Sequence, residues 1–385
     1  MNFWSLVLAD LKAIVSDKAI VITLFGGVAF YAFLYPLPYL HNVATVQEIV
    51  IVDHDKSSLS RMVIRHANAS PKLQVVGLVD SEAEAKNWLE QGKTKGIVII
   101  PAQFRQQLLI GKGSTLVIGG DANYFLVYSA IAEGMVEVGL DAAKHIQFTA
   151  MLAKGEDARQ AALSLHALKL NSVPAFNPSL GYLSYIVPAV LLLVLHQTML
   201  IGTGILGAGQ WRSQGYWQQV SPMQLLLGRL ASFSFIYAMF SAFYFGWCHY
   251  YYQLTVVGEL VQVAMMLLPF ILASAAAGIA MSCLYQRRDF PTQVVLLISM
   301  PIIFASGLVW PVTLIPEPLV WLSQIVPAVP AIMAMTQLNQ MGTDWQTVFP
   351  LWLQLWGLFI LFFGIAYVGI ANKQQQYSTQ HQTHR

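Results

Sequence analysis

Charged residues are scarce in this chain. Only 10% of its 385 residues are Asp, Glu, Lys or Arg, whereas 56% are hydrophobic, and the mean hydropathy is +0.56. Soluble domains average about 25% charged and 45–50% apolar residues. A long chain with so little charge cannot cover its surface for water, so we expect it to reside in a membrane. The net charge of +2 and the lack of a basic stripe give no indication of a nucleic-acid partner.

Cysteine and catalytic motifs are also nearly absent. The only cysteines, Cys248 and Cys283, lie in or beside apolar runs, so the sequence has neither a disulfide framework nor a Cys/His zinc spacing. It has no nucleophile elbow and no H-E-x-x-H. Both Gly-Lys pairs outside the apolar runs lack the glycine that a phosphate loop needs five residues earlier, because Asn87 and Gln106 stand there. We therefore expect no enzyme activity and no metal or cofactor bound by this chain.

Long apolar runs are what the sequence has instead. A helix needs about 20 apolar residues to cross a bilayer. Six candidate spans of this kind lie at residues 19–37, 182–206, 225–250, 260–284, 294–310 and 348–370.

The distribution of Lys and Arg among the connections predicts how these spans are oriented. The connections near 253–258 and 311–347 contain neither residue type. The positive-inside rule then places both termini in the cytoplasm and the long segment after the first span outside, as in a multi-pass protein of the bacterial inner membrane. The cations on the other side are Lys12, Lys18, Arg212, Arg287, Arg288, Lys373 and Arg385, with Arg229 just inside the third span.

Residues 1–18 predict an amphipathic helix at the membrane interface. Phe3, Val7, Leu11 and Ile14 fall on one helical face. The charges on the other face argue against a simple extension of the first span, and no A-x-A site follows that span, which disfavours a cleaved signal peptide. The polar face carries Ser5, Asp10, Lys12 and Asp17.

The segment 41–179 holds most of the charge and predicts an α/β domain. Short β-branched runs at 48–53, 73–79, 96–101 and 114–121 alternate with helical patterns, which is typical of βαβ units. Ser81 and Glu84 form a capping-box pattern. A helical arm follows at 124–170, with a break near 155–157. Asp53, His54 and Asp55 could bind a metal or act as acid and base, but a solvated loop with a helix cap is the favoured interpretation.

The middles of the spans contain almost no ionisable groups. Proton- or sodium-driven transporters need such groups at membrane depth. His196 is the main exception, and a polar contact between helices explains it better than a proton path. Small residues four apart, such as Ser274 and Gly278, predict close helix packing. With no internal repeat either, the chain must be passive or must draw work from a partner.

The connection 210–222 is the candidate site for that partner. It is short, polar and aromatic, and the charge bias places it in the cytoplasm. Ser221 and Pro222 suit the N-cap and first turn of a helix, so we expect a small helix that docks a motor domain. An interfacial loop with aromatic anchors is the alternative. The candidate coupling residues are Gln210, Trp211, Arg212, Tyr216, Trp217, Ser221 and Pro222.

Five motifs, in order, resemble the permease subunit of type 2 ATP-binding-cassette (ABC) exporters of the multidrug or antibiotic-efflux kind. They are "VDHDKSSLSR", "GIVIIPAQFRQQLLIGKGSTLVIGGDAN", "FNPSLGYLSYIVPAVL", "SPMQLLLGRL" and the proline-rich stretch 304–342. The resemblance covers nearly the whole chain. It implies an α-helical membrane protein with six transmembrane helices and an α/β extracytoplasmic domain between the first two. The expected parts are an interfacial helix at 1–18, a first span at 19–40, the periplasmic domain at 41–179, a five-helix region at 180–372 with a re-entrant hairpin near 311–340, and a tail at 373–385.

The resemblance also implies partners. It predicts a second permease copy or a paralogue, a cytoplasmic ABC ATPase that uses ATP and Mg²⁺, membrane lipid around the spans, and in some systems a periplasmic adaptor with an outer-membrane channel. A drug, a lipid or a similar hydrophobic or amphipathic substrate would move outward. The family's acidic run before the "SP" element is missing here, since that place has Arg212 but no acid. The expected exit-gate hairpin contains Pro311, Pro316, Pro318, Pro327 and Pro330.

A different class of function stays open on the sequence. The chain could be a membrane scaffold or sensor that transports nothing and whose outer domain binds a ligand or partner. A six-span bundle without a cytoplasmic output domain favours the permease.

Overall fold

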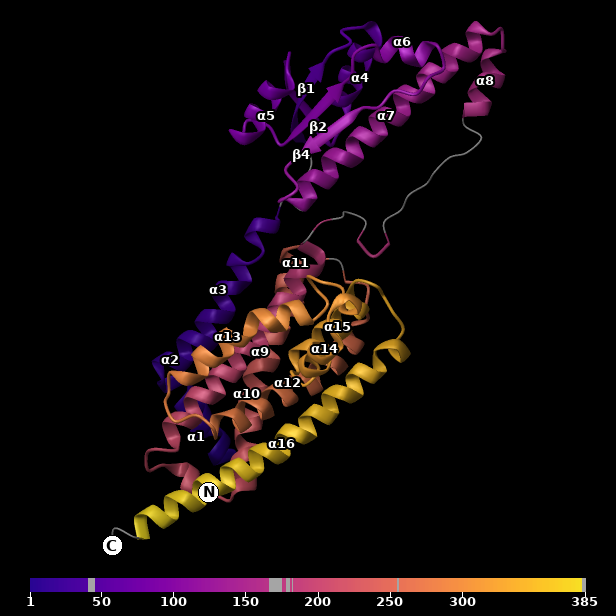
Figure 1. Cartoon of the computed structure of the whole chain (residues 1–385). Coiled ribbons are helices and arrows are strands. Elements are labelled where there is room, and N and C mark those ends of the chain that lie inside the picture. The colour runs from indigo at the N-terminus through magenta and orange to yellow at the C-terminus, as the bar shows by residue number, and fades with distance from the viewer. Residues whose placement is uncertain (41–45, 166–174, 178–180, 182, 255, 383–385) are drawn as a thin grey trace. The chain divides into compact units, whose positions relative to one another are not determined.

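The computed structural model describes residues 1–40, 46–165, 175–177, 181, 183–254 and 256–382, with only the backbone at 185 and 380–382 (Figure 1). The chain divides into two compact units. The helical unit consists of Met1–Asn42 and Ala175–Arg385, and the sheet unit consists of Val43–Pro174.

The sheet unit is built on four strands, found where the β-branched runs predicted them. They are β1 (Gln47–Asp53), β2 (Leu73–Val79), β3 (Gly96–Ile100) and β4 (Val117–Gly120), in the order β2-β1-β3-β4. β1 is parallel to both neighbours, as βαβ units require, whereas β4 is antiparallel to β3. The run Ile49–Val52 is completely buried because helices pack on both faces of this central strand.

The described residues of the sheet unit also form five helices: α4 (Ser58–Ala69), α5 (Glu82–Glu90), α6 (Phe104–Leu109), α7 (Phe125–Ala153) and α8 (Ala158–Leu165). Ser57 and Ser81 cap α4 and α5. Of the predicted capping box, the structure shows the N-cap half, in which the Ser81 hydroxyl accepts from the Glu84 amide at 3.2 Å. The break between α7 and α8 contains Gly155 at φ +86° and confirms the predicted interruption of the helical arm. The Asp53 carboxylate accepts from the amides of Asp55 and Lys56, so it closes the turn before α4.

The helical unit begins with α1 (Phe3–Ser16), α2 (Lys18–Val21), the π-helical segment η1 (Ile22–Gly26), α3 (Gly27–Leu34) and the 3-10 turn η2 (Leu37–Tyr39). The helix predicted for the N-terminus is present, but its faces are rotated from the prediction. Leu6, Val7, Asp10 and Ile14 are the buried side chains, and Phe3 is exposed. The placement of Asp10 on a solvent face was therefore wrong, and the reason is a buried partner described below.

The rest of this unit is helical. It contains α9 (Leu183–Gln210), η3 (Tyr216–Gln218), α10 (Pro222–Ala242), η4 (Phe243–Cys248), α11 (His249–Tyr251), α12 (Leu260–Ser282), α13 (Phe290–Ala305), η5 (Val312–Leu314), α14 (Glu317–Ser323), α15 (Ala328–Asn339) and α16 (Trp345–Gln382).

Within the described residues, five helical segments are long and apolar enough to cross a membrane, and a bent pair could make a sixth. The pair joins α14 to α15 at an angle of 93°. These segments lie close to five of the six predicted spans. They are Lys18–Tyr39, Ile186–Gln210, Pro222–Tyr251, Leu260–Ser282 and Trp345–Thr379.

The predicted span at 294–310 differs from the observed helix. α13 has 16 residues and is shorter than the roughly 20 needed for a full crossing. It starts earlier than predicted, since Pro291 occupies its first turn, and it ends just before Gly307 at φ +80°. At the other end of the unit, α16 continues as one helix to Gln382, through the start of the tail expected at 373.

Small residues allow the close helix contacts that the sequence predicted. A Cβ on Gly204 of α9 would lie 2.7 Å from Cβ of Pro291 at the start of α13. His196 makes a 3.0 Å hydrogen bond between Nδ1 and the Ser274 hydroxyl, which joins α9 to α12. The interpretation of His196 as a contact between helices is thereby confirmed.

Candidate functional site

The connection between α9 and α10 forms a compact loop rather than a separate small helix. After Gln210 the chain makes only the short turn η3, and the Ser221-Pro222 pair begins the long helix α10 itself. Ser221 is the predicted N-cap: its hydroxyl accepts from the Gln224 amide at 3.2 Å, and the Gln224 side chain accepts from the Ser221 amide. The expectation of an independent docking helix was wrong, whereas the cap was predicted correctly.

A chain of partly buried polar contacts fastens this loop to two helices. The Tyr216 hydroxyl donates to the Asp10 carboxylate of α1 and accepts from the Gln210 amide at 2.6 Å. The Gln210 carbonyl in turn accepts from the Arg229 guanidinium of α10. Arg229 lies 3.7 Å from Asp10, and both side chains are fully buried. We call these four residues the polar network.

Burial raises the pKa values of Asp10 and Tyr216 in the polar network. Burial raises the pKa of the Asp10 carboxyl, and the nearby Arg229 charge works against this effect. Burial and the adjacent Asp10 also raise the pKa of the Tyr216 hydroxyl, which therefore stays protonated and continues to donate. A buried charge without a partner is costly, so the two charges depend on each other to remain inside the protein.

A set of aromatic contacts fastens the same loop to two further helices. The Trp211 indole donates to the Ser282 carbonyl at the end of α12, at 3.0 Å. Trp217 packs edge-to-face between Trp211 and Tyr377 of α16. The Gln374 side chain, also on α16, donates to the carbonyls of Trp217 and Val220 at 2.6 and 3.1 Å.

The structure therefore brings together four of the predicted coupling residues, and the other three lie outside this cluster. Gln210, Trp211, Tyr216 and Trp217 share one cluster, in which Trp211 and Trp217 are buried. Trp211 and Trp217 hold the loop against α12 and α16, and the role of these residues in coupling stays a prediction. Pro222 is half-buried in the first turn of α10. The exposed side chains of the loop are Arg212, Ser213, Gln214, Gln219 and Ser221.

Sequence reasoning missed Asp10, Arg229, Gln374 and Tyr377. Asp10 supplies a carboxylate to a loop that has no acid of its own. A signal was present for Arg229, which is a lone charge within an apolar stretch, whereas Asp10 lies two residues before Lys12 on a helix read as amphipathic. Gly228 permits their approach, because a Cβ there would lie 2.7 Å from Leu6 Cδ2 of α1. The pairing itself depends on the packing of α1 against α10, which the local pattern does not contain.

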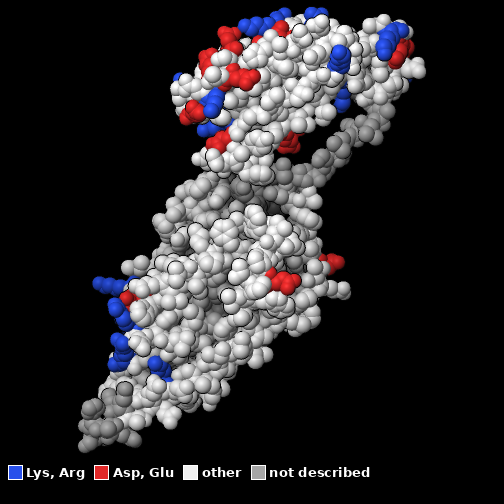
Figure 2. All heavy atoms as spheres, viewed as in Figure 1, with Lys and Arg blue, Asp and Glu red and all other residues white. Residues whose placement is uncertain are grey.

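Basic residues cluster on the helical unit near α1 and α2, whereas acidic residues lie toward the end that carries α14 and α15 (Figure 2). Arg288 forms an ion pair with Asp17, and Arg287 pairs with Asp289 at 3.0 Å. The remaining surface of this unit in that view is almost uncharged.

The predicted hairpin contains two short helices arranged around its prolines. Pro316 and Pro327 immediately precede α14 and α15, and Pro318 lies in the first turn of α14. Pro311 precedes η5, and Pro330 is buried near the start of α15. The first N–H groups of a helix have no partner within the helix, so proline, which lacks this group, loses no hydrogen bond at these places.

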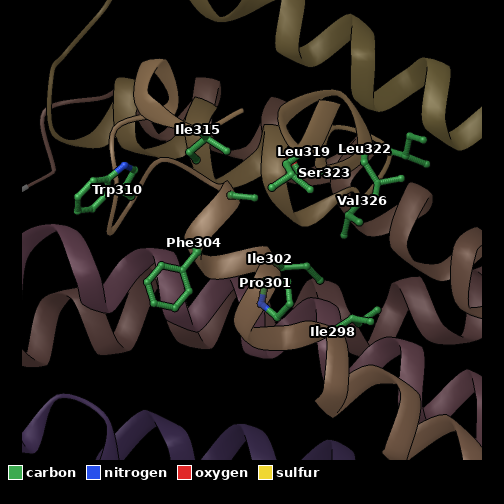
Figure 3. A pocket seen from close by; sticks show the side chains of 12 residues that line it. Ile298, Pro301, Ile302, Phe304, Trp310, Ile315, Leu319, Leu322, Ser323 and Val326 are labelled. Atoms are coloured by element: carbon green, nitrogen blue, oxygen red, sulfur yellow. The ribbon is translucent and has the colours of Figure 1, made fainter. Parts of the chain in front are cut away.

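An apolar pocket of about 570 Å³ lies between this hairpin and α13 (Figure 3). Ile298, Ile302 and Phe304 line it from α13, facing Leu319 and Val326 on the hairpin side. Ser323 is the one polar lining residue. Such a pocket can take an apolar body but offers almost no hydrogen bonds.

The part of the chain that the structure describes contains no group of three His, Cys, Asp or Glu side chains placed to hold a metal. Cys248 and Cys283 are buried and unpaired by disulfide.

Comparison with known proteins identifies the family. No curated protein matches the chain. The family model described as "ABC-2 family transporter protein" matches residues 18–368, which is most of the chain. The match includes the apolar helices, the loop between α9 and α10, and the hairpin. The membrane domain of this family is a permease that works with an ABC ATPase, so this chain is a multi-pass membrane permease and belongs to the ABC-2 family of transporter proteins.

Proposed function

We propose that this permease exports a hydrophobic or amphipathic substrate with energy from a separate ABC ATPase that docks on the loop 210–222. The observation that carries this proposal is the fastening of the loop through Tyr216 to Asp10 and through Gln210 to Arg229. The exposed residues Arg212, Gln214 and Gln219 would contact the ATPase, and the buried ones would pass its movement on.

The contacts provide a mechanical route from the loop into the membrane helices. Tyr216 leads to α1, Gln210 and Arg229 join α9 to α10, Trp211 leads to α12, and Gln374 leads to α16. Because packed elements shift as units between discrete arrangements, a displacement of the loop would move these helices together. No sodium or proton site is needed in this scheme, since ATP and Mg²⁺ are held by the partner.

The charge distribution supports an orientation with the loop and both termini in the cytoplasm of a bacterial cell and the helical unit in its inner membrane. Cations gather near α1 and α2, while Glu259, Glu317 and Asp344 lie in the other connections. The sheet unit would then be periplasmic. An adaptor and an outer-membrane channel would extend the export route from there.

The hairpin of α14 and α15 is suited to the exit of the path. Broken helices at membrane depth are tolerated only where protein covers them or where they line a cavity. The 93° bend between α14 and α15 and the pocket beside α13 support this placement of the hairpin. A second permease copy would face the first across this path, as a dimer, and the hairpin with its five prolines would gate the outer mouth.

The test is isolation of the native complex. The tagged chain, extracted from its own membranes, is expected to retain an ABC ATPase, and the surface variant Arg212→Glu with Gln219→Glu is expected to lose it while eluting as a folded protein. The Arg159→Glu variant in the sheet unit is the matched control and should retain the ATPase. Retention by the loop variant contradicts the docking site. Unchanged export after deletion of the protein contradicts transport and favours a sensor.

A further inference from the structure

A cleft of about 620 Å³ lies wholly within the sheet unit, between α4, α6 and α7. Its volume falls in the range of roughly 300–1,000 Å³ that is usual for small-molecule sites. The permease role proposed above does not use it.

The floor of the cleft is apolar. Leu59 and Met62 contribute from α4, Leu108 from α6, and Ile146 and Ala150 from α7. Met62 belongs to the buried core of the unit, and Leu59 and Leu108 pack against that core. Ile146 is half-buried and Ala150 is exposed. Thr149 adds a hydroxyl on the α7 side.

The rim of the cleft is cationic. Arg65, Arg105 and Lys154 line it together with His145, and none of the lining residues is acidic. Among the ion pairs of the described residues, none involves Arg65, Arg105 or Lys154. Arg65, Arg105 and Lys154 thus lie beside one apolar surface without an ion pair among the described residues.

Two carboxylates contact residues beside the cleft. The Asp55 carboxylate accepts from the backbone amide of Arg105 at 3.2 Å. Asp141, four residues before His145 on α7, lies 2.7 Å from Nδ1 of His66. Neither acid lines the cleft, so the positive charge of the rim is available to a ligand.

From this arrangement we infer that the cleft binds an amphipathic organic anion, a carboxylate or phosphate carried on an apolar body. The two guanidinium groups offer paired donors that match a carboxylate or phosphate, and the floor takes the apolar part out of water. A cationic or neutral amphiphile would leave the rim charges without a counter-charge. This inference about ligand binding does not depend on the direction of transport.

The test uses the full chain in phosphatidylcholine nanodiscs and the fluorescent anion 1-anilinonaphthalene-8-sulfonate as the probe. We expect saturable binding that weakens as salt is raised, because exposed charges are screened. Octyl phosphate should displace the probe at a concentration at least tenfold lower than octanol or octyltrimethylammonium. In a parallel sample with phosphatidylglycerol, probe displacement without competitor assigns the anion to a lipid headgroup, and no displacement assigns it to a free amphiphile.

Matched variants assign the site. Arg65→Gln with Arg105→Gln is expected to weaken probe binding at least tenfold, whereas Arg159→Gln, an exposed cation on α8 outside the cleft, should leave it unchanged. If the double variant does not fold, each single variant should weaken binding about threefold. Equal binding by the variants and the unmodified chain, or equal displacement by octanol and octyl phosphate, would overturn the inference.

Discussion

The Asp10 carboxylate and the Arg229 guanidinium lie 3.7 Å apart, and neither side chain is exposed. One belongs to the N-terminal helix α1 and the other to the long apolar helix α10. The pair joins the first helix of the chain to the loop proposed to receive the ATPase, since Tyr216 donates to Asp10 and Gln210 accepts from Arg229.

Removing one member of this pair should lower the free energy of unfolding. Arg229→Met leaves the Asp10 charge buried without its partner, and such changes cost about 3–5 kcal/mol. The double variant Asp10→Leu with Arg229→Met should recover much of that loss, because no charge is left buried. Thermal unfolding in detergent measures both. The exposed Arg212→Met is the control and should stay within about 0.5 kcal/mol of the unmodified chain. A double variant as unstable as the single one would contradict a coupled pair.

The Tyr216 hydroxyl should matter for both stability and coupling. Tyr216→Phe removes the donor to Asp10 and leaves buried polar atoms unmatched, at a cost of about 1–3 kcal/mol. We also expect substrate-stimulated ATP hydrolysis of the assembled transporter to fall. Tyr250→Phe removes a hydroxyl from a side chain that is 86% exposed and should change neither quantity. Normal stimulation with Tyr216→Phe would show that the hydroxyl plays no part in coupling.

The contact of α16 with the loop allows a test in which folding is preserved. Gln374→Leu removes two hydrogen bonds to the loop carbonyls, and Leu is as good a helix former as Gln. We predict lower transport per ATP hydrolysed, measured in proteoliposomes with the ATPase. Gln375→Leu, at the next and exposed position, should transport normally. If both variants behave alike, α16 does not take its movement from the loop.

Close packing at Gly204 predicts that a change to Ala there destabilises the protein, whereas the same change at Gly357 stabilises it. Gly204→Ala brings a methyl group to within 2.7 Å of the rigid Pro291 ring, and overpacking of this kind costs about 1–3 kcal/mol. Gly357→Ala in α16 meets nothing within 4 Å and should stabilise the helix by roughly 0.5–1 kcal/mol. Thermal unfolding should therefore shift in opposite directions, and equal shifts would contradict the packing of α9 against α13.

Much of the fold could be predicted from local pattern. The β-branched run Ile49–Val52 indicated a buried strand, Ser221-Pro222 indicated a helix start, and the apolar runs indicated the long helices. These features depend on neighbouring residues alone. The short length of α13 could not be predicted, because apolar residues continue in the sequence after the helix has ended at Ala305, just before Gly307.

The candidate site was only half predicted. The loop was found from its polarity, but the packing of Trp217, which is only 1% exposed, against Tyr377 of α16 was not predicted. Asp10 was placed in solvent because a charge on an amphipathic helix usually lies there. Its burial follows from Arg229, which is distant in sequence, so no reading of the first 18 residues alone could have shown it.

Photo-crosslinking tests the central claim most directly. A benzoylphenylalanine at Gln214, an exposed position of the loop, is expected to crosslink to the ABC ATPase in intact membranes. The same group at Leu322 of the hairpin, which is 64% exposed, should give no ATPase crosslink. An ATPase adduct at Leu322 and none at Gln214 would contradict the account, because the force would then enter the permease at the opposite end.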